Sequence, residues 1–302
     1  LSGWPPTLGC CAYLIEGVTV CVIVAGLSNS LFDAWQLSTD WLLMRDFLRF
    51  FDRLSRLTIW LINQLHVEMT MIEVRPFAQL GGANHGWLNA KHHFSFASYY
   101  DSKRMNWGQM RVWNDDTIQP HTGFATHPHQ DMEIITYVRQ GAISHQDSLG
   151  NKGRTIAGDV QVMSAGTGIR HSEYNHEDEV TKIFQIWIHP EQTGLPPSWG
   201  TRPFPRGENA GEFVTLASGL KGDDEALPIR AKARLVAATL NEGHEAKYEI
   251  APGRKAYLVV AKGAIEVNGV AVKTGDGAAI QSEKLLNVKG IEQAEVVLVD
   301  VA

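Results

Sequence analysis

A repeated unit in the later part of the chain constrains the fold more than any other feature of the 302 residues. The segment Tyr137-Val-Arg-Gln-Gly-Ala-Ile143 is matched by Val259-Val-Ala-Lys-Gly-Ala-Ile265, and Ala157-Gly-Asp159 is matched by Thr274-Gly-Asp276. Around both copies, segments of alternating apolar and polar residues are bounded by Gly, Asn, Asp and Pro, which is typical of a β barrel or sandwich. We therefore predict an all-β chain with two copies of one unit. The expected strands include 108–113, 133–139, 155–157, 182–188, 256–260 and 295–301.

Histidine pairs with strand spacing occur in the first copy, at His127-Pro-His129 and His171-Ser-Glu173. Side chains two residues apart on a strand point to the same face, so each pair presents both groups to one side. Two neighbouring strands could thus direct three imidazoles and one carboxylate to one point, a ligand set that Fe, Zn, Cu, Ni, Mn or Co accepts. A single His-x-His pair is more often a surface or hydrogen-bonded feature, so the flanking residues decide.

The flanking residues resemble the two paired metal-binding motifs of the cupin superfamily. Gly123 precedes the first pair and Glu133 follows it. A Ser-Ala-Gly-Thr-Gly turn precedes the second pair, with Ser164 where the cupin motif usually has proline, and Asn175 follows at the expected offset. Two matched motifs indicate metal binding far more strongly than one pair does.

Six segments carry a narrower resemblance: His85-Gly-Trp87, Phe94-Ser-Phe96, Tyr99-Tyr-Asp101, Asn114-Asp-Asp116, Thr126 to Glu133 and Met163 to Glu173. Together they resemble the pirin family, and within it a bacterial quercetinase-like branch, from about Met71 to the C-terminus. The resemblance implies that the metal ligands are His127, His129, His171 and Glu173. Many other cupins use the glutamate of the first motif, which here is Glu133, so Glu133 ranks second.

The same resemblance implies an all-β bicupin of two stacked β-barrels. We expect a metal-binding cupin over 71–193, a crossover rich in Pro and Gly over 194–225, and a C-terminal cupin over 226–302. No histidine follows His244, and the second copy has cationic and apolar residues at the position of the first motif. We therefore expect no ligands in the second cupin and one metal per chain.

Residues 1–70 differ from the rest of the chain because they contain no lysine and are rich in Trp, Leu and Phe. Apolar residues at helical spacing, with arginines on the other side, predict an amphipathic helix over 41–65. The apolar run 10–27 is short for a membrane span and is interrupted by Glu16. Three interpretations stay open: a targeting leader, an artefact of an upstream reading frame, and a genuine interfacial helix. Membrane contact is expected only if this extension is genuine.

Charge and cysteine content narrow the classes of protein. A net charge of −6 and a pI near 6.1, without a basic run, argue against direct nucleic-acid binding. The three cysteines all lie upstream of Met71, so the pirin-like part has no disulfide framework. These features favour a cytoplasmic protein, which we expect to be a monomer.

A metal held by three histidines and one glutamate leaves coordination positions free, as catalytic sites require. The resemblance implies a quercetin 2,3-dioxygenase that uses iron(II), or Ni, Co, Mn, Cu or Zn. It would open the heterocycle of a flavonol such as quercetin with O₂ and release carbon monoxide. Glu173 would be the catalytic residue, either staying ligated or taking the hydroxyl proton. The alternative is a non-enzymatic, metal- and redox-sensing pirin that acts as a regulatory binding protein.

Other polar and aromatic candidates are weaker. His92 and His93 are adjacent, so they cannot both point to one strand face, and we expect them to form loop hydrogen bonds. His145 and His176 lie in polar, turn-like stretches and are expected to be solvated. Aromatic residues that could line a flavonol pocket, although packing in the barrel is the expected role of most of them, are Trp87, Phe94, Phe96, Tyr99 and Trp113.

Overall fold

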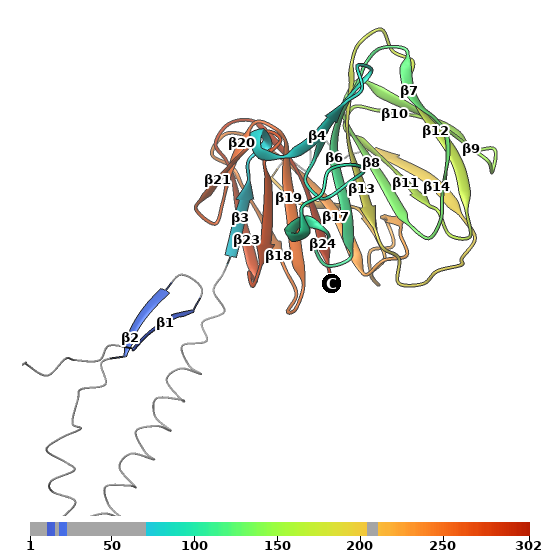
Figure 1. Cartoon of the computed structure of the whole chain (residues 1–302). Helices are drawn as coiled ribbons and strands as arrows, with labels where there is room; N and C mark the ends of the chain where they lie inside the picture. The colour runs from blue at the N-terminus through green and yellow to red at the C-terminus, as the bar shows by residue number, and fades with distance from the viewer. Residues whose placement is uncertain (1–10, 16–17, 23–70, 204–210) are drawn as a thin grey trace, which may run out of the picture. The chain divides into compact units, whose positions relative to one another are not determined.

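The computed structural model describes residues 11–15, 18–22, 71–203 and 211–302 (Figure 1). In the N-terminal extension, β1 (Cys11–Ile15) and β2 (Val18–Val22) pair antiparallel within the apolar run. The amphipathic helix expected over 41–65 lies outside the described residues. Among the residues that are described, no helix has the length and apolar character needed to cross a membrane.

The predicted all-β, two-barrel architecture is confirmed for the rest of the chain. The first barrel has two sheets, and its strands are joined by loops that include two short 3-10 turns, η1 (Phe77–Gln79) and η2 (Ser102–Arg104). The larger sheet has the order β14 (Ser198–Pro203), β11 (Asp159–Ser164), β8 (Glu133–Gln140), β13 (Thr181–Ile188), β6 (Met110–Ile118), β5 (Leu88–His92), β4 (Gly81–Asn84). The smaller sheet has the order β10 (Lys152–Ile156), β9 (Ala142–Asp147), β12 (Ile169–Asn175), β7 (Thr122–His129).

The second barrel repeats this division into a seven-stranded and a four-stranded sheet. The larger sheet has the order β16 (Leu227–Pro228), β15 (Val214–Ser218), β17 (Ala233–Leu240), β24 (Ala294–Val301), β19 (Lys255–Lys262), β22 (Gly277–Gln281), β3 (Met71–Arg75). The smaller sheet has the order β18 (Glu245–Glu249), β23 (Leu285–Gly290), β20 (Ala264–Val267), β21 (Val270–Lys273).

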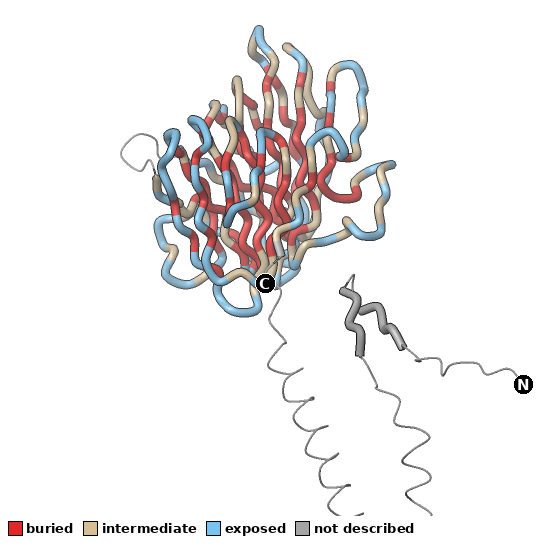
Figure 2. The backbone as a smooth tube through the Cα atoms, turned by 90° about the vertical axis from the view of Figure 1, so that its left-hand side faces the viewer, coloured by how far each residue is buried: buried red, intermediate tan, exposed pale blue. Residues whose placement is uncertain are grey.

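The two seven-stranded sheets share one hydrophobic cluster, and central strands such as β8 and β24 are buried on both faces. On β8, Ile135 and Tyr137 belong to the cluster shared with the second barrel, whereas Ile134 and Val138 face the interior of the first. Strand β24 alternates in the same way between the shared cluster and the interior of the second barrel. A sheet covered on both faces is built from nearly continuous apolar runs. Figure 2 shows the result, with buried residues along the strands and exposed residues at the turns.

Tight turns explain the repeated glycines. Gly141 and Gly263 end β8 and β19 with φ angles of 73° and 79°, a left-handed conformation that glycine adopts without steric cost. At Gly263 a Cβ atom would also lie 2.2 Å from the carbonyl oxygen of Gln293. The hairpin β20–β21 turns at Asn268-Gly269, both with positive φ, as the Asn-Gly turn signal predicts.

Strand β3 precedes the first barrel in the sequence but belongs to a sheet of the second barrel. Strand β3 pairs with β22 of the second barrel, although residue 71 was expected to open the first domain. The expected crossover, 194–225, contributes β14 to the first barrel and β15 to the second. The domain limits given above therefore stay a prediction.

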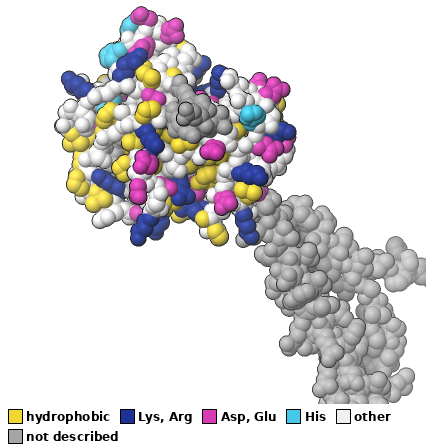
Figure 3. All heavy atoms as spheres, turned by 180° about the vertical axis from the view of Figure 1, so that it is seen from behind, with side chains coloured by type: hydrophobic (Ala, Val, Ile, Leu, Met, Phe, Trp, Pro, Cys, Tyr) yellow, Lys and Arg dark blue, Asp and Glu magenta, His cyan; other side chains and the backbone are white. Residues whose placement is uncertain are grey.

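The surface of the barrels carries charges of both signs. On the face in Figure 3, the described Lys and Arg side chains are interspersed with Asp and Glu.

Candidate metal centre

Strand β12 carries the centre of the site because it pairs with β7 on one side and β9 on the other. On the β7 side, His171 lies opposite His127 and Ile169 lies opposite His129. On the β9 side, His171 lies opposite Asp147, and Glu173 lies opposite His145. A register shift between His171 and Glu173 interrupts the ladder with β7, as a β-bulge does. Three adjacent strands thus bring histidines and acids into one region.

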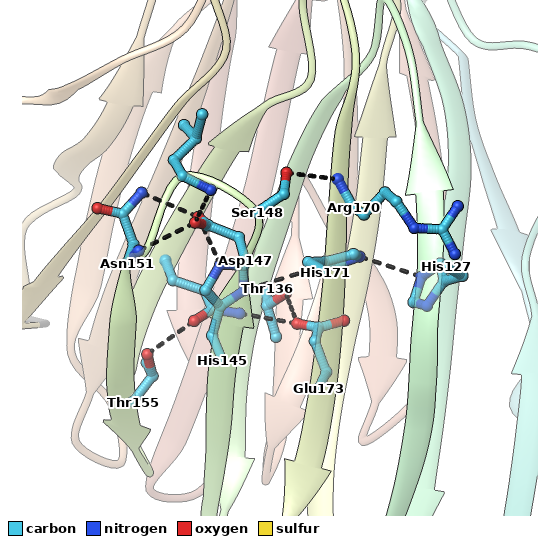
Figure 4. A network of polar contacts seen from close by, with 12 residues as sticks. His127, Thr136, His145, Asp147, Ser148, Asn151, Thr155, Arg170, His171 and Glu173 are labelled. Carbon is cyan, nitrogen blue, oxygen red and sulfur yellow. Dashed lines mark hydrogen bonds and ion pairs between the residues drawn. The ribbon is translucent and has the colours of Figure 1, made fainter.

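Three of the predicted ligands form a group that we call the histidine cluster: His127, His129 and His171. Their nitrogen atoms lie within 4.8 Å of one another. The closest pair is Nε2 of His171 and Nε2 of His127, at 3.0 Å (Figure 4). His171 is 1% exposed, whereas His127 and His129 are partly exposed. The cluster is therefore deep on the β12 side and accessible on the β7 side.

The environment of the cluster favours neutral imidazoles. Burial lowers the pKa of His129 to about 4, and the neighbouring His171 and His127 act in the same direction. Burial lowers the pKa of His171 to about 3, again with help from neighbouring imidazoles. A neutral imidazole has one nitrogen lone pair available to a metal.

The hydrogen bonds of His127 indicate which of its two nitrogens could bind a cation. Its Nδ1 lies 2.7 Å from the backbone carbonyl oxygen of Ala125, which can only accept, so Nδ1 must donate. In the neutral ring, Nε2 then carries the lone pair, and this atom lies 3.0 Å from Nε2 of His171. Three imidazole nitrogens within 4.8 Å of one another suit a divalent transition metal. The residues present therefore fit a metal ion.

Glu173 lies beside the cluster and is held by neutral donors. Its Oε1 accepts hydrogen bonds from Thr136 Oγ1 at 3.1 Å and Gln161 Nε2 at 2.7 Å. Its Oε2 accepts from Gln185 Nε2 at 2.7 Å. The carboxylate lies within 4.8 Å of nitrogen atoms of both His171 and His145, in a second group that shares His171 with the histidine cluster. The assignment of Glu173 as the fourth ligand stays a prediction.

His145 is the residue that sequence reasoning misplaced. The expectation that it is solvated is wrong, since it is 2% exposed and stacks at 5.0 Å on the indole of Trp199. Its Nε2 lies 3.1 Å from Oδ2 of Asp147 and its Nδ1 lies 3.4 Å from Nδ1 of His171. The spacing of two between His145 and Asp147 on β9 was the available signal. His176, by contrast, is exposed as expected.

Two other sets of residues lie outside the histidine cluster. Glu133 is buried on β8, where its Oε2 accepts a hydrogen bond from Ser164 at 2.6 Å, and burial raises its pKa. His92 and His93 form hydrogen bonds, but to strand residues instead of loop residues: Asn114 Oδ1 on β6 and the hydroxyl of Tyr257 on β19, both at 2.8 Å. Unlike loop residues, both rings are buried.

A small cavity lies behind Gln185, which donates to Glu173. Its volume is about 70 Å³, and Phe96, Phe124 and Asp116 are among the residues that line it. Pockets for drug-sized ligands usually measure about 300–1,000 Å³, so this cavity admits molecules of the size of water or O₂ only. Of the aromatic candidates, Phe94 and Trp113 pack in the cluster shared by the two barrels.

Comparisons with known proteins identify the family of the chain. Residues 73–188 match the family model described as Pirin, and residues 215–301 match the one described as Quercetinase C-terminal cupin domain. A pirin-like protein of Caulobacter vibrioides is 62% identical over 77% of this chain and 100% of its own length. A quercetin 2,3-dioxygenase of Escherichia coli is 42% identical over 76% of this chain and 98% of its own. The crystal structure of the bacterial pirin YhhW from Escherichia coli, in complex with nickel(II), has a TM-score of 0.72 and 42% identity, covering 76% of this chain and 99% of that chain.

Proposed function

Because the chain belongs to the pirin family, we propose that it is a metal-dependent quercetin 2,3-dioxygenase. The reaction adds O₂ to a flavonol such as quercetin, opens the heterocycle and releases carbon monoxide. The observation that carries the proposal is the convergence of three imidazoles, of which the two on β7, His127 and His129, are partly exposed. The bacterial pirin YhhW was crystallised in complex with nickel(II). For this chain we propose iron(II), with Ni, Co, Mn, Cu and Zn as alternatives.

Binding is the task of the histidine cluster, with Glu173 as the proposed fourth ligand. A divalent cation held there would make the flavonol hydroxyl more acidic and favour electron transfer from the flavonol to O₂. The flavonol would approach on the side of His127 and His129, since the cavity behind Gln185 is too small for it. On the β12 side, the ring of His171 is buried.

Proton transfer is the task that we assign to Glu173. Its three hydrogen-bond donors, Thr136, Gln161 and Gln185, are neutral, so they orient the carboxylate without providing a counter-charge. A carboxylate positioned in this way can accept the proton of the flavonol hydroxyl once contact distance is reached. Glu173 would either stay ligated to the cation or swing off it to take this proton.

The test combines metal analysis with oxygen uptake. Protein purified without chelator is assayed for bound metal, stripped, reloaded with each candidate metal and mixed with quercetin, and O₂ consumption and CO release are followed. Glu173→Gln should lower turnover at full metal loading by at least ~10²-fold, the lower end of what a positioned base contributes. Glu133→Gln is the matched control and should retain most activity.

Each result separates the interpretations. A larger loss for Glu133→Gln than for Glu173→Gln would mean that the chain follows the general cupin pattern. If no metal supports O₂ uptake with quercetin or related flavonols, the dioxygenase proposal fails and the regulatory binding protein is the remaining candidate.

A further inference from the structure

Asp147 is a buried carboxylate that accepts every hydrogen bond it makes. Its Oδ1 accepts from the backbone N–H groups of Leu149 and Asn151, at 2.9 and 3.0 Å. Its Oδ2 accepts from the side-chain amide of Asn151 at 2.9 Å and faces Nε2 of His145 at 3.1 Å. Backbone and amide N–H groups can only donate, so they fix the carboxylate as the acceptor. His145 must then donate from Nε2.

The tautomer of His145 influences which nitrogen of the His171 ring carries a proton. An imidazole that carries one N–H has its lone pair on the other nitrogen, so in that form of His145 the lone pair is on Nδ1. That atom faces Nδ1 of His171 at 3.4 Å, the long end of a hydrogen bond. His171 can accordingly donate from Nδ1 to His145, and its Nε2 then keeps a lone pair. This lone pair faces that of His127 at 3.0 Å, an arrangement that a cation between the two rings stabilises. The order Asp147, His145, His171 is visible in Figure 4.

We propose that His145 and Asp147 are positioning residues that hold His171 in the tautomer and orientation needed for metal binding through Nε2. The proposal rests on the metal centre proposed above and names the residues that orient one of its ligands. Outer hydrogen bonds of this kind raise the basicity of a ligand histidine, and losing them typically costs 10–100-fold in metal affinity.

The packing around His145 restricts the orientation of its ring. The indole of Trp199, from β14 of the opposite sheet, stacks on it with an interplanar angle of 11°. Gly153 lies opposite His145 in the ladder of β10 and β9, and a Cβ atom there would come within 2.2 Å of the indole. The glycine thus leaves room for the tryptophan that holds the imidazole in plane.

A competing explanation comes from the same three strands. Ligand atoms of His145, His171 and Glu173 lie within 4.8 Å of one another and could hold a second cation. In that case Nδ1 of His171 would be a ligand instead of a hydrogen-bond donor. The two explanations therefore predict different protonation states of His171 and different metal stoichiometries.

The first measurement needs no substitution. Long-range ¹H–¹⁵N NMR spectra of the protein loaded with Zn²⁺, which has a filled d shell, report near pH 7.5 which nitrogen of each histidine ring carries a proton. We expect the Nδ1–H form for His171 and the Nε2–H form for His145. The opposite tautomer at His171 would overturn the proposal, as would two nickel ions bound per chain in a titration with Ni²⁺ alone.

The second measurement uses matched variants. Asp147→Asn keeps an acceptor for the turn but places a donor near His145, and His145→Phe keeps a ring against Trp199 but removes both nitrogens. Each should weaken Ni²⁺ binding 10–100-fold in competition with a chromophoric chelator. Asn151→Ala removes one partner of Asp147 without affecting its role as acceptor and should bind Ni²⁺ within about threefold of wild type.

Wild-type Ni²⁺ affinity in both Asp147→Asn and His145→Phe, with melting curves that show folded protein, would refute the positioning role. If a variant does not fold, the wild-type tautomers still decide. Absence of Ni²⁺ binding by the wild-type protein itself would instead refute the metal centre on which the proposed function depends.

Discussion

Acid should destabilise the contact between the two barrels through His93. This ring is fully buried next to the shared cluster, and its Nδ1 lies 2.8 Å from the hydroxyl of Tyr257 on β19. Burial lowers its pKa well below the usual 6.5, and the charges of Arg75, Arg104 and Arg139 act in the same direction. The folded protein therefore keeps His93 neutral, while the unfolded chain takes up a proton below pH 6.5.

The sign and size of the effect follow from proton linkage. Below pH 6.5 the unfolded state binds more protons than the folded state, so stability falls as pH falls and is fully present above 6.5. Each pH unit between 6.5 and the lower folded-state pKa is worth about 1.4 kcal/mol for one group. Between pH 7.5 and pH 5.5 we therefore expect His93 to account for a loss of about 1.4 kcal/mol.

The assay is urea unfolding of the metal-free protein at both pH values, for wild type and His93→Gln. Groups other than His93 titrate in both proteins, so their effects cancel in the difference. The wild type should lose about 1.4 kcal/mol more than His93→Gln between the two pH values. His244→Gln, at an exposed turn residue, is the control and should follow the wild type. Equal losses for wild type and His93→Gln would show that the ring is not kept neutral.

Three further predictions concern the site and the chain ends. Alanine at any member of the histidine cluster should remove most bound metal by elemental analysis while the barrels stay folded, because two large cores do not depend on an ion; a triple variant with stoichiometric metal would disprove the ligand assignment. Gly123→Ala would place a Cβ atom 2.3 Å from the carbonyl oxygen of Glu173. We therefore expect the free energy of unfolding, measured in urea, to fall by about 1–3 kcal/mol and metal binding to weaken. Wild-type values for both would mean that β7 can move away from β12 without cost. A protein that starts at Met71 should match the full chain in melting temperature and metal content, and a melting point lowered by several degrees would place part of the extension in the fold.

Strands and turns were predictable where local sequence decides them. The expected strands 133–139 and 182–188 correspond to β8 and β13, with limits that differ by one residue. The Asn268-Gly269 turn was predictable because it depends on two adjacent residues with positive φ. The pairing of β3 with β22 was not, because five residues carry no local signal for a partner about 200 positions away.

The site was predictable to the extent that its residues share a strand. Spacing of two identified both pairs on β7 and β12, since that spacing fixes the face. His145 was missed because its neighbours, Ser144, Gln146 and Asp147, make the segment look solvated. Its burial comes from Trp199 in the opposite sheet, which lies 54 residues further along the chain (199 − 145). Burial by a residue that is distant in the sequence leaves no pattern in a short segment of the chain.

The pairing of β3 with β22 also sets an order of events during synthesis. About 200 residues separate the two strands, so at about 5–20 residues per second β3 waits on the order of 10–40 s for its partner. The first barrel can close in that interval, but β3 cannot take its place before β22 leaves the ribosome. A fragment that begins at Met71 and stops before the second barrel would carry an unpaired edge strand prone to association. The second barrel expressed alone would lack the strand that covers β22, and supplying residues 71–75 as a separate peptide should restore it.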